Sequence, residues 1–450
     1  MGEYDDLAGR PARAGLLARA GSIALALSCA CNPNSFDQLS SSARAADSGP
    51  ERGDAGEPPG RDASMDAGLD ATPPQVTIDA GTVDAAVAHD AALDAATEID
   101  DAAAMPADAE PAGCVPAADP EQVQVHAGEL GALAVSDLRE PRAGPAVRIG
   151  ERVLWTFWAA DSSLAVWSDV PAEPLSATPA LHAAVPPLPL LAAVAVPANT
   201  TASIASALAV SESEALIYFA AFYIFELQGV GLARIGLDAS QAELIHAAGE
   251  LFRYPPPADP QAPAPWRPRF YVGAFVHAEP DDTYVYVYAC DPNPAAPDEQ
   301  AGGQSADPCR LARAPLAQAS DGAAYRYWNG ADWDSSVDAA RPVITGVSGR
   351  LSVSYNRYLE RFVAVHTAGP TNRVTLRWAD RPEGPFHPLG QFETLPATGA
   401  YGFTFEALEQ PALRDECQRT LFVTYTLPLA PAEAGGPDVY ESRLVRVELE

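Results

Sequence analysis

Four cysteines spread along the chain are the residues whose type and spacing first suggest chemistry. They are Cys114, Cys290, Cys309 and Cys417. An even number of cysteines in an exported chain predicts two disulfides, for which three pairings are open. Cys290 and Cys309 flank a turn-rich insertion, so a bridge would close its base and leave Cys114 for Cys417. Zinc is the rival explanation, but no Cys-x-x-Cys pair or nearby histidine supports it. Disulfides are therefore expected.

The first 31 residues have the pattern of an export signal. Arg10, Arg13 and Arg19 precede a short apolar run that ends in small residues and Cys29. The run is shorter than the about 20 apolar residues that a membrane-spanning helix needs. A cysteine directly after such a run predicts a bacterial lipoprotein lipidated at Cys29, although Ala26 stands where such signals carry leucine. The prediction is an outer-membrane or cell-surface lipoprotein anchored in the membrane by lipid. A periplasmic or secreted chain is the alternative, and a cytosolic chain comes last.

The segment 32–113 is rich in Ala, Asp, Pro, Ser and Gly and has almost no aromatic residues. Such a composition cannot bury enough apolar surface to offset the entropy of ordering it, so we expect a disordered linker. Between residues 46 and 113, acidic residues outnumber basic ones by 16 to 2. The chain as a whole has a formal net charge of −32, which argues against nucleic acid as a partner.

From residue 114 onward the chain consists of short aromatic runs of alternating pattern, separated by Pro, Gly and Asp turns, which predicts β-strands. Five copies of an aromatic run followed by a return strand can be aligned on one leucine each. These leucines are Leu164, Leu232, Leu311, Leu376 and Leu444. A repeated β unit of this length indicates a propeller blade, because one sheet cannot cover both its faces alone. The sequence predicts an all-β, five-bladed propeller over 114–450, with an irregular β-sandwich as the alternative.

Motifs for cofactors and catalytic triads are missing from the sequence. Gly229-x-Gly231 has no third glycine and no following helix, so it is not a dinucleotide motif. The seven histidines show no metal-ligand spacing, and no Gly-x-Ser-x-Gly sequence occurs. We therefore expect no cofactor and assign no metal ligands, while calcium in a central channel stays open. Arginines recurring near the return strands, among them Arg313 and Arg377, are interpreted as ion pairs or rim charges.

Three segments of the second half carry a resemblance to a known family. They are the Tyr-x-Tyr-Trp-x-Gly-x-x-Trp turn at 325–333, the strand Ser-Val-x-Tyr-Asn at 352–356, and the return at 379–385 that ends in Gly-Pro. Over roughly 130–450 the chain resembles glycoside hydrolase family 183, formerly a domain of unknown function. The resemblance implies a five-bladed propeller related to furanosidases and an endo-D-arabinanase activity, with an arabinan-type polysaccharide as partner.

The same resemblance suggests which carboxyl groups carry the chemistry. Asp137 matches the first aspartate of the family's first blade, but Ala159 stands in register with the second. Asp161, two residues later, would point to the same face of a strand. Glycoside hydrolysis generally needs two carboxyl groups across the scissile bond. The candidate partners of Asp137 are therefore Asp161, Glu406 and Glu409.

Aromatic and amide side chains on the expected inner strands are candidates for sugar contact. They are Trp155, Tyr355, Asn356, Tyr401 and Phe403. Aromatic faces stack on sugar rings and an amide bonds hydroxyl groups, although most aromatics on blades pack the core. Three functions follow as hypotheses. The first is an arabinan-type hydrolase, the second is a non-catalytic carbohydrate-binding propeller, and the third is a protein-interaction propeller.

Overall fold

The structure is a computed structural model that describes most of the chain after residue 113. The described residues are 114–117, 119–133, 135, 142–159, 162–171, 175–179, 181, 188–189, 191, 200–223, 226–252, 266–290, 307–431 and 439–450. The predicted export signal at 1–31, Cys29 and the predicted linker at 32–113 lie outside these residues. Within them, no helix is long and apolar enough to cross a membrane.

The described strands form five antiparallel blades that follow one another along the chain. Blades 3 and 4 are joined in one sheet. Blades 1 and 2 consist of β2 (Arg142–Ile149), β3 (Arg152–Ala159), β4 (Ser162–Asp169) and β5 (Leu188–Pro189), then β6 (Thr200–Ala209), β7 (Glu214–Tyr223), β8 (Glu226–Gly236) and β9 (Glu243–His246). Blades 3 and 4 consist of β10 (Val272–Ala278), β11 (Thr283–Ala289), β12 (Asp307–Pro315) and the hairpin β13 (Arg326–Trp328) and β14 (Trp333–Asp334), then β15 (Pro342–Asn356), β16 (Arg361–Ala368), β17 (Arg373–Ala379) and β18 (His387–Glu393). Blade 5 consists of β19 (Phe405–Glu409), β20 (Thr420–Leu429), β21 (Val439–Leu449) and β1 (Val125–Ala132).

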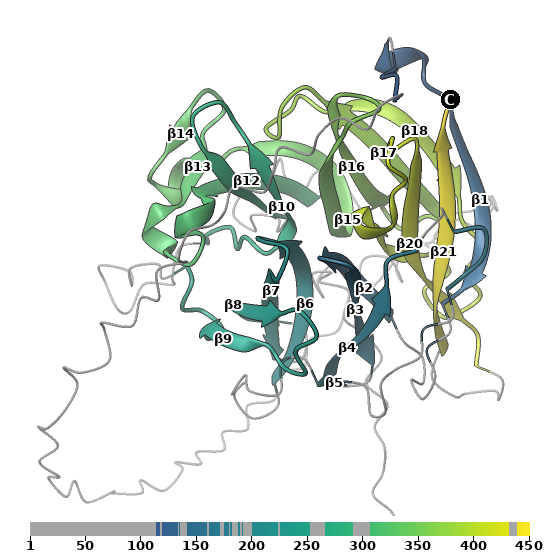
Figure 1. The fold of residues 1–450 in the computed structure, drawn as a ribbon, viewed down its shortest axis with the longest axis horizontal. Helices are drawn as coiled ribbons and strands as arrows, with labels where there is room; N and C mark the ends of the chain where they lie inside the picture. Colours follow the sequence, from purple (N-terminus) through teal and green to yellow (C-terminus); the bar gives the residue numbers. More distant parts are fainter. Residues whose placement is uncertain are drawn as a thin grey trace, which may run out of the picture.

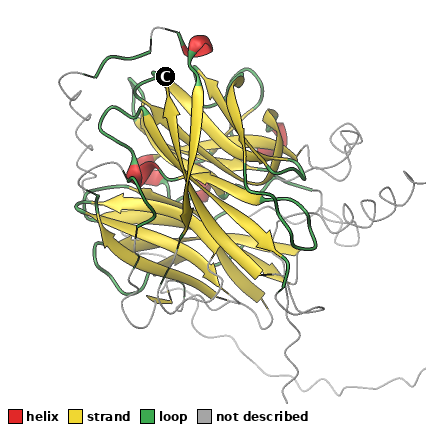
Figure 2. Ribbon diagram, turned by 90° about the vertical axis from the view of Figure 1, so that its right-hand side faces the viewer, coloured by secondary structure: helices red, strands yellow, loops and turns green. Residues whose placement is uncertain are grey.

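Short 3₁₀ turns complete the regular structure of the described residues. They are η1 (Pro120–Gln122), η2 (Leu316–Gln318), η3 (Gly322–Ala324), η4 (Val337–Ala339) and η5 (Pro411–Leu413). Seen from the side, strands make up nearly all of the regular structure (Figure 2).

The innermost strands β2, β6, β10 and β15 follow one another around a common centre (Figure 1), and β19 is the corresponding strand of blade 5. Each of these strands contacts the innermost strand of the next blade, and β19 contacts β2. The ring therefore closes, and the prediction of a five-bladed propeller is confirmed. Radial packing buries both faces of every blade, which no blade could achieve alone.

The five leucines used to align the repeats occupy equivalent positions in the five blades. Each lies on the third strand of its blade, and four of them, Leu232, Leu311, Leu376 and Leu444, are fully buried. Each pairs with a residue of the second strand, as Leu311 pairs with Tyr288. The register of the repeats could thus be read from the alternation of apolar side chains.

Strand β15 joins blades 3 and 4 into one continuous sheet. Its first half pairs with β12, placing Ile344 opposite Cys309, and its second half pairs with β16, placing Tyr355 opposite Phe362. The two halves meet at a register shift after Ser348. Gly349 lies there with a φ of 77°, a left-handed conformation that glycine adopts without steric cost.

The two ends of the propeller meet in blade 5. The N-terminal β1 pairs with the C-terminal β21, so that Val125 lies opposite Leu449. A disulfide joins Cys114 to Cys417, at a sequence separation of 303, and a second joins Cys290 to Cys309. Both predicted pairings are present. The first disulfide ties the start of the folded region to the blade that β1 completes.

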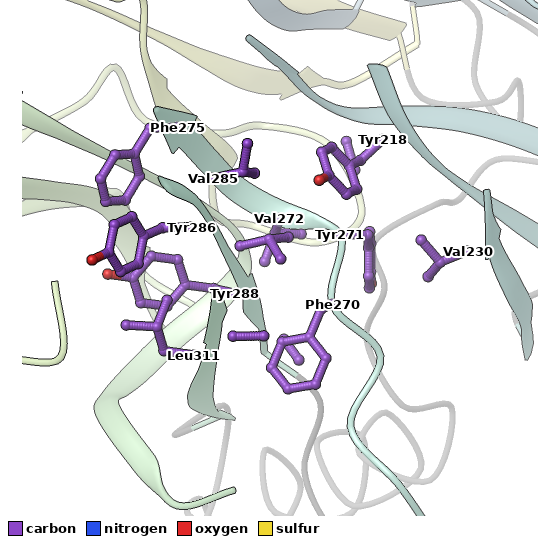
Figure 3. Packing of buried hydrophobic residues seen from close by; sticks show 14 of the residues in the cluster. Tyr218, Val230, Phe270, Tyr271, Val272, Phe275, Val285, Tyr286, Tyr288 and Leu311 are labelled. Carbon is purple, nitrogen blue, oxygen red and sulfur yellow. The ribbon is translucent and has the colours of Figure 1, made fainter. Parts of the chain in front are cut away.

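The largest aromatic cluster packs blade 2 against blade 3 (Figure 3). Tyr218 and Tyr325 are fully buried, and their hydroxyl oxygens lie 2.6 Å apart in a hydrogen bond. Phe275 stacks on Tyr286 with ring centroids 5.2 Å apart. The aromatic runs of the sequence therefore serve mainly as the interior between blades.

Candidate functional site

Glu406 is a buried carboxylate at the centre of the propeller. It lies on β19, the innermost strand of blade 5, and is 3% exposed. Its φ is 58°, and the pairing of β19 with β20 shifts register between Phe405 and Leu408. A left-handed conformation costs a residue other than glycine about 1–3 kcal/mol. Such strain at a buried charged residue is typical of functional sites.

Arg350 holds this carboxylate and connects three blades. Its Nε lies 3.4 Å from Oε1 of Glu406. Its Nη1 donates to the carbonyl of Ile204 at 2.7 Å, and its Nη2 donates to Oγ of Ser203 at 2.8 Å. The hydroxyl of Thr426 donates to the other oxygen of Glu406 at 3.2 Å. Both carboxylate oxygens therefore have a partner.

A small cavity adjoins this ion pair, and we call it the axial cavity. It measures about 10 Å³, and its lining includes Arg142, Gly144, Thr156, Trp158, Arg350 and Glu406. This volume holds about one water molecule. The guanidinium of Arg142 lies 3.5 Å from the centroid of the Trp158 ring. The buried Nε1 of Trp158 has no hydrogen-bond partner among the described residues, so a residue of the cavity wall carries an unused donor there.

Asp137 and Asp161 lie outside the described residues. Residues a short distance away in sequence are described. Asp137 precedes the first residue of β2, Arg142, and Asp161 directly precedes the first residue of β4, Ser162. Arg142 pairs with Trp158 across β2 and β3, and both line the axial cavity. Arg142 follows Asp137 by five positions in sequence, and Trp158 precedes Asp161 by three.

Two of the predicted contact residues have their polar atoms engaged within the protein. Trp155 is 1% exposed, and its indole donates to Oγ of Ser168 at 3.0 Å. Asn356 is fully buried, donates to the carbonyl of Gln418 at 2.8 Å and accepts from the backbone of Leu359 at 2.9 Å. These contacts give the two residues structural roles in the core and in the turn after β15.

The other predicted residues lie nearer the surface or at the opposite end of the axis. Tyr355 is half-buried, with its ring 5.2 Å from that of His277. Tyr401 is half-buried, with its ring 6.0 Å from Phe403. Glu409 is 2% exposed and lies 2.5 Å from Nη2 of Arg414, in a buried ion pair. None of these residues lines the axial cavity.

A larger cavity, which we call the rim pocket, lies between blades 3 and 4. It measures about 440 Å³, and its lining includes His277, Glu279, Arg313, Trp328, Trp333 and Glu383. Residues from the end of β10, from β12, from the hairpin of β13 and β14, and from the turn before β18 converge there. The sequence reasoning assigned no site here. The signal was present in the tryptophans of the 325–333 turn and in the charged return at 379–385.

The two cavities lie at opposite ends of the innermost strands. Gly273 approaches the carbonyl of Leu351, and His277 contacts Tyr355, so β10 and β15 run in the same direction. Arg350, at the start of this inner stretch, contacts Glu406 in the axial cavity. The rim pocket begins at His277, at the end of β10. A ligand in one cavity therefore does not occupy the other.

Arg313 is held rigidly in the wall of the rim pocket. Its Nη1 donates to Oε2 of Glu279 at 2.9 Å. Its guanidinium lies 4.2 Å from the ring centroid of Tyr284 and 4.3 Å from that of Trp333, which are cation–π contacts. Its interpretation as an ion-paired arginine holds, but the same residue also shapes a pocket. Burial lowers the pKa of His277, against the charge of Glu279, which raises it.

No metal site is evident in the described part of the chain. There, no group of three or more His, Cys, Asp or Glu residues is arranged to hold a metal ion.

Comparison with known proteins locates one family match within the propeller. Residues 247–406 match the profile of DUF4185, a domain of unknown function. This stretch, about a third of the chain, contains the whole rim pocket and ends at Glu406, while Asp137 and Asp161 precede it. No curated protein matches the chain in sequence.

Several solved structures are similar in shape. A GH43_1 enzyme from Xanthomonas citri complexed with xylose has a TM-score of 0.40 at 14% identity and covers 70% of this chain and 89% of its own. A family 117 glycoside hydrolase from Zobellia galactanivorans has a TM-score of 0.38 at 11% identity and covers 74% and 91%. Fructan 1-exohydrolase IIa from Cichorium intybus has a TM-score of 0.39 at 9% identity and covers 70% and 57%. Similarity at this level does not identify the ligand of this chain.

Proposed function

We propose that this protein is a glycan-directed propeller whose axial end binds a furanoside-containing polysaccharide. The observation that carries the proposal is Glu406, a buried carboxylate in a strained backbone conformation at the start of β19. Strain of this kind persists where the surrounding structure over-determines it, and it concentrates at ligand sites. The indole donor of Trp158, which has no hydrogen-bond partner among the described residues, lies on a residue of the same cavity wall and supports an occupant with an oxygen acceptor, such as water or a hydroxyl group.

As an enzyme, the protein would be an endo-acting arabinofuranoside hydrolase. Asp137 would supply one carboxyl group, and Asp161 or Glu406 the other. Hydrolysis with retention needs the two groups about 5–5.5 Å apart, and inversion about 6.5–9.5 Å. The resemblance of the sequence to glycoside hydrolase family 183 supports this activity. A lipid anchor at Cys29 would hold the propeller at the cell envelope.

Binding without hydrolysis is the second candidate function. Two observations favour it. Ala159 stands where the resemblance expects an aspartate, and both oxygens of Glu406 are already engaged by Arg350 and Thr426. A carboxylate held in this way binds and orients more readily than it transfers protons.

The test incubates the oxidised full-length chain with a D-arabinan-containing polysaccharide and measures released oligosaccharides and retention in a pull-down. Asp137→Asn and Glu406→Gln are run alongside, with Glu448→Gln on the exposed face of β21 as the control. Release that Asp137→Asn abolishes and Glu448→Gln preserves supports a hydrolase. Retention without release, lost in Glu406→Gln, supports a binding protein. If the chain neither releases oligosaccharides nor retains the polysaccharide, D-arabinan is ruled out as its ligand.

A further inference from the structure

The rim pocket carries chemistry that the axial site does not use. Its volume of about 440 Å³ lies in the range of pockets that bind small ligands. The indoles of Trp328 and Trp333 meet at 63° with centroids 5.5 Å apart and form one corner of the wall. Flat aromatic walls suit the apolar face of a sugar ring, and the surrounding donors and acceptors suit its hydroxyl groups.

Negative charge exceeds positive charge in this lining. The carboxyl groups of Glu279, Asp332, Asp380 and Glu383 line the pocket together with the guanidinium groups of Arg313 and Arg381. Arg313 is committed to Glu279, at 2.9 Å, and is enclosed by two aromatic rings. Its charge is therefore neutralised within the wall and is not offered to a ligand.

Glu383 is a carboxyl group of this lining whose ion pair within the described residues is long, whereas Glu279 pairs closely with Arg313 and Asp380 with Arg361. The side chain of Glu383 is only 11% exposed, and its ion pair with Nη1 of Arg381 spans 3.9 Å. The side chain of Arg381 is itself 73% exposed, so solvent screens this pair. Burial raises the pKa of Glu383, and the charge of Glu279 adds to the rise. A cation in the pocket would relieve this unfavourable burial.

We propose that the rim pocket binds a saccharide with a free amino group, with its ammonium at Glu383 and its ring against the tryptophan corner. An ammonium group has three donors and forms charge-assisted hydrogen bonds with carboxylates. Trp328 offers a ring face for additional cation–π attraction. A neutral sugar would leave Glu383 with only the solvent-screened guanidinium of Arg381 as its counter-ion. The ligand class is thus narrower than carbohydrate in general, and the site is separate from the axial cavity.

The test uses isothermal titration of the oxidised full-length chain with a tetramer of glucosamine and with its fully N-acetylated counterpart. The two probes share ring and linkage and differ in charge. We expect the amino tetramer to bind at least about tenfold more tightly, since a hydrogen bond to a charged group contributes about 1.5–3 kcal/mol. Added salt should weaken its binding.

Variants assign the binding to the pocket. Glu383→Gln keeps the shape of the side chain and removes its charge. It should weaken the binding of the amino tetramer at least about tenfold. Glu393→Gln, on β18 with a side chain 65% exposed, should leave it unchanged. Asp332→Asn serves as a second pocket variant should Glu383→Gln not fold. Equal binding of both tetramers, no binding, or binding indifferent to both pocket variants would overturn the proposal.

The axial variant separates this proposal from the proposed function. Glu406→Gln should leave binding of the amino tetramer unchanged while it weakens polysaccharide retention. Loss of tetramer binding in Glu406→Gln with a folded protein would contradict a separate rim site.

Discussion

Arg350 on blade 4 lies 3.4 Å from the carboxylate of Glu406 on blade 5, and its other nitrogens bond to Ser203 and Ile204 on blade 2. One guanidinium thus connects three blades at the axis. Its side chain is 13% exposed and that of Glu406 is 4% exposed. Removing one partner of such a buried pair leaves the other charge uncompensated, which typically costs about 3–5 kcal/mol.

The first prediction concerns this pair. Arg350→Leu should lower the free energy of unfolding by about 3–5 kcal/mol, measured by urea denaturation. Arg373→Leu is the control, because Arg373 pairs with Glu393 at the surface, where such a pair contributes about 0–1 kcal/mol. Equal losses of unfolding free energy in the two variants would mean that the buried axial ion pair stabilises the fold no more than a surface ion pair does.

The second prediction concerns the disulfide that joins Cys114 and Cys417. In the chain-entropy account, a bridge stabilises more when it closes a longer loop. The loop between Cys114 and Cys417 spans 303 residues and that between Cys290 and Cys309 spans 19. Replacing both cysteines of the long-range bridge by serine should cost roughly 5 kcal/mol, against roughly 3 for the other. If the thermal melts of the two double variants coincide, the prediction that the long-range disulfide stabilises the fold more is contradicted.

The blades and their order could be predicted from the sequence, but the long strand β15 and the rim pocket could not. Leucines such as Leu311 repeat in one register because alternation reports which face is buried. The shift at Gly349 lets β15 serve two blades, and no periodic pattern reveals such a change. The resemblance pointed to Glu406, but its partner Arg350 comes from another blade. Likewise, Glu279 and Glu383 meet only because blades 3 and 4 pack together.

The third prediction concerns acid sensitivity. His366 on β16 is fully buried, and burial lowers its pKa from 6.5 to about 4, with the charge of Arg377 contributing and a bond to the Thr367 carbonyl opposing. Between these pH values the unfolded chain binds a proton that the folded protein does not. Stability should therefore be complete above pH 6.5 and fall toward pH 4, by roughly 3 kcal/mol from this residue.

His366→Leu removes this titration. The difference in unfolding free energy between the variant and the parent should move in favour of the variant as the pH drops from 7 to 4. Urea denaturation at five pH values measures it. A difference that stays constant with pH would show that His366 does not contribute.

The fourth prediction concerns Glu383 in the absence of a ligand. Its pKa is raised by burial, with Glu279 raising it further and Arg381 and Arg313 opposing. A raised pKa of an acid means that the folded protein binds a proton more readily than the unfolded chain, so the ionised form destabilises the fold at neutral pH. Glu383→Gln should therefore raise the melting temperature at pH 7, and the gain should vanish below the ordinary glutamate pKa. A lowered melting temperature at pH 7 would show that the carboxylate is well compensated.

The last prediction compares two tryptophans of β3. The indole of Trp155 donates to Ser168, whereas the buried indole nitrogen of Trp158 has no partner within the described part of the chain. A buried donor without a partner costs about 1–3 kcal/mol. Replacing Trp158 by phenylalanine removes this donor, and the free energy gained offsets part of the packing energy lost with the smaller ring. Trp158→Phe should destabilise the protein less than Trp155→Phe, by about 1–3 kcal/mol in urea denaturation. In the polysaccharide pull-down the order should reverse, because only Trp158 lines the axial cavity. Retention that survives Trp158→Phe but not Trp155→Phe would place the sugar elsewhere on blade 1.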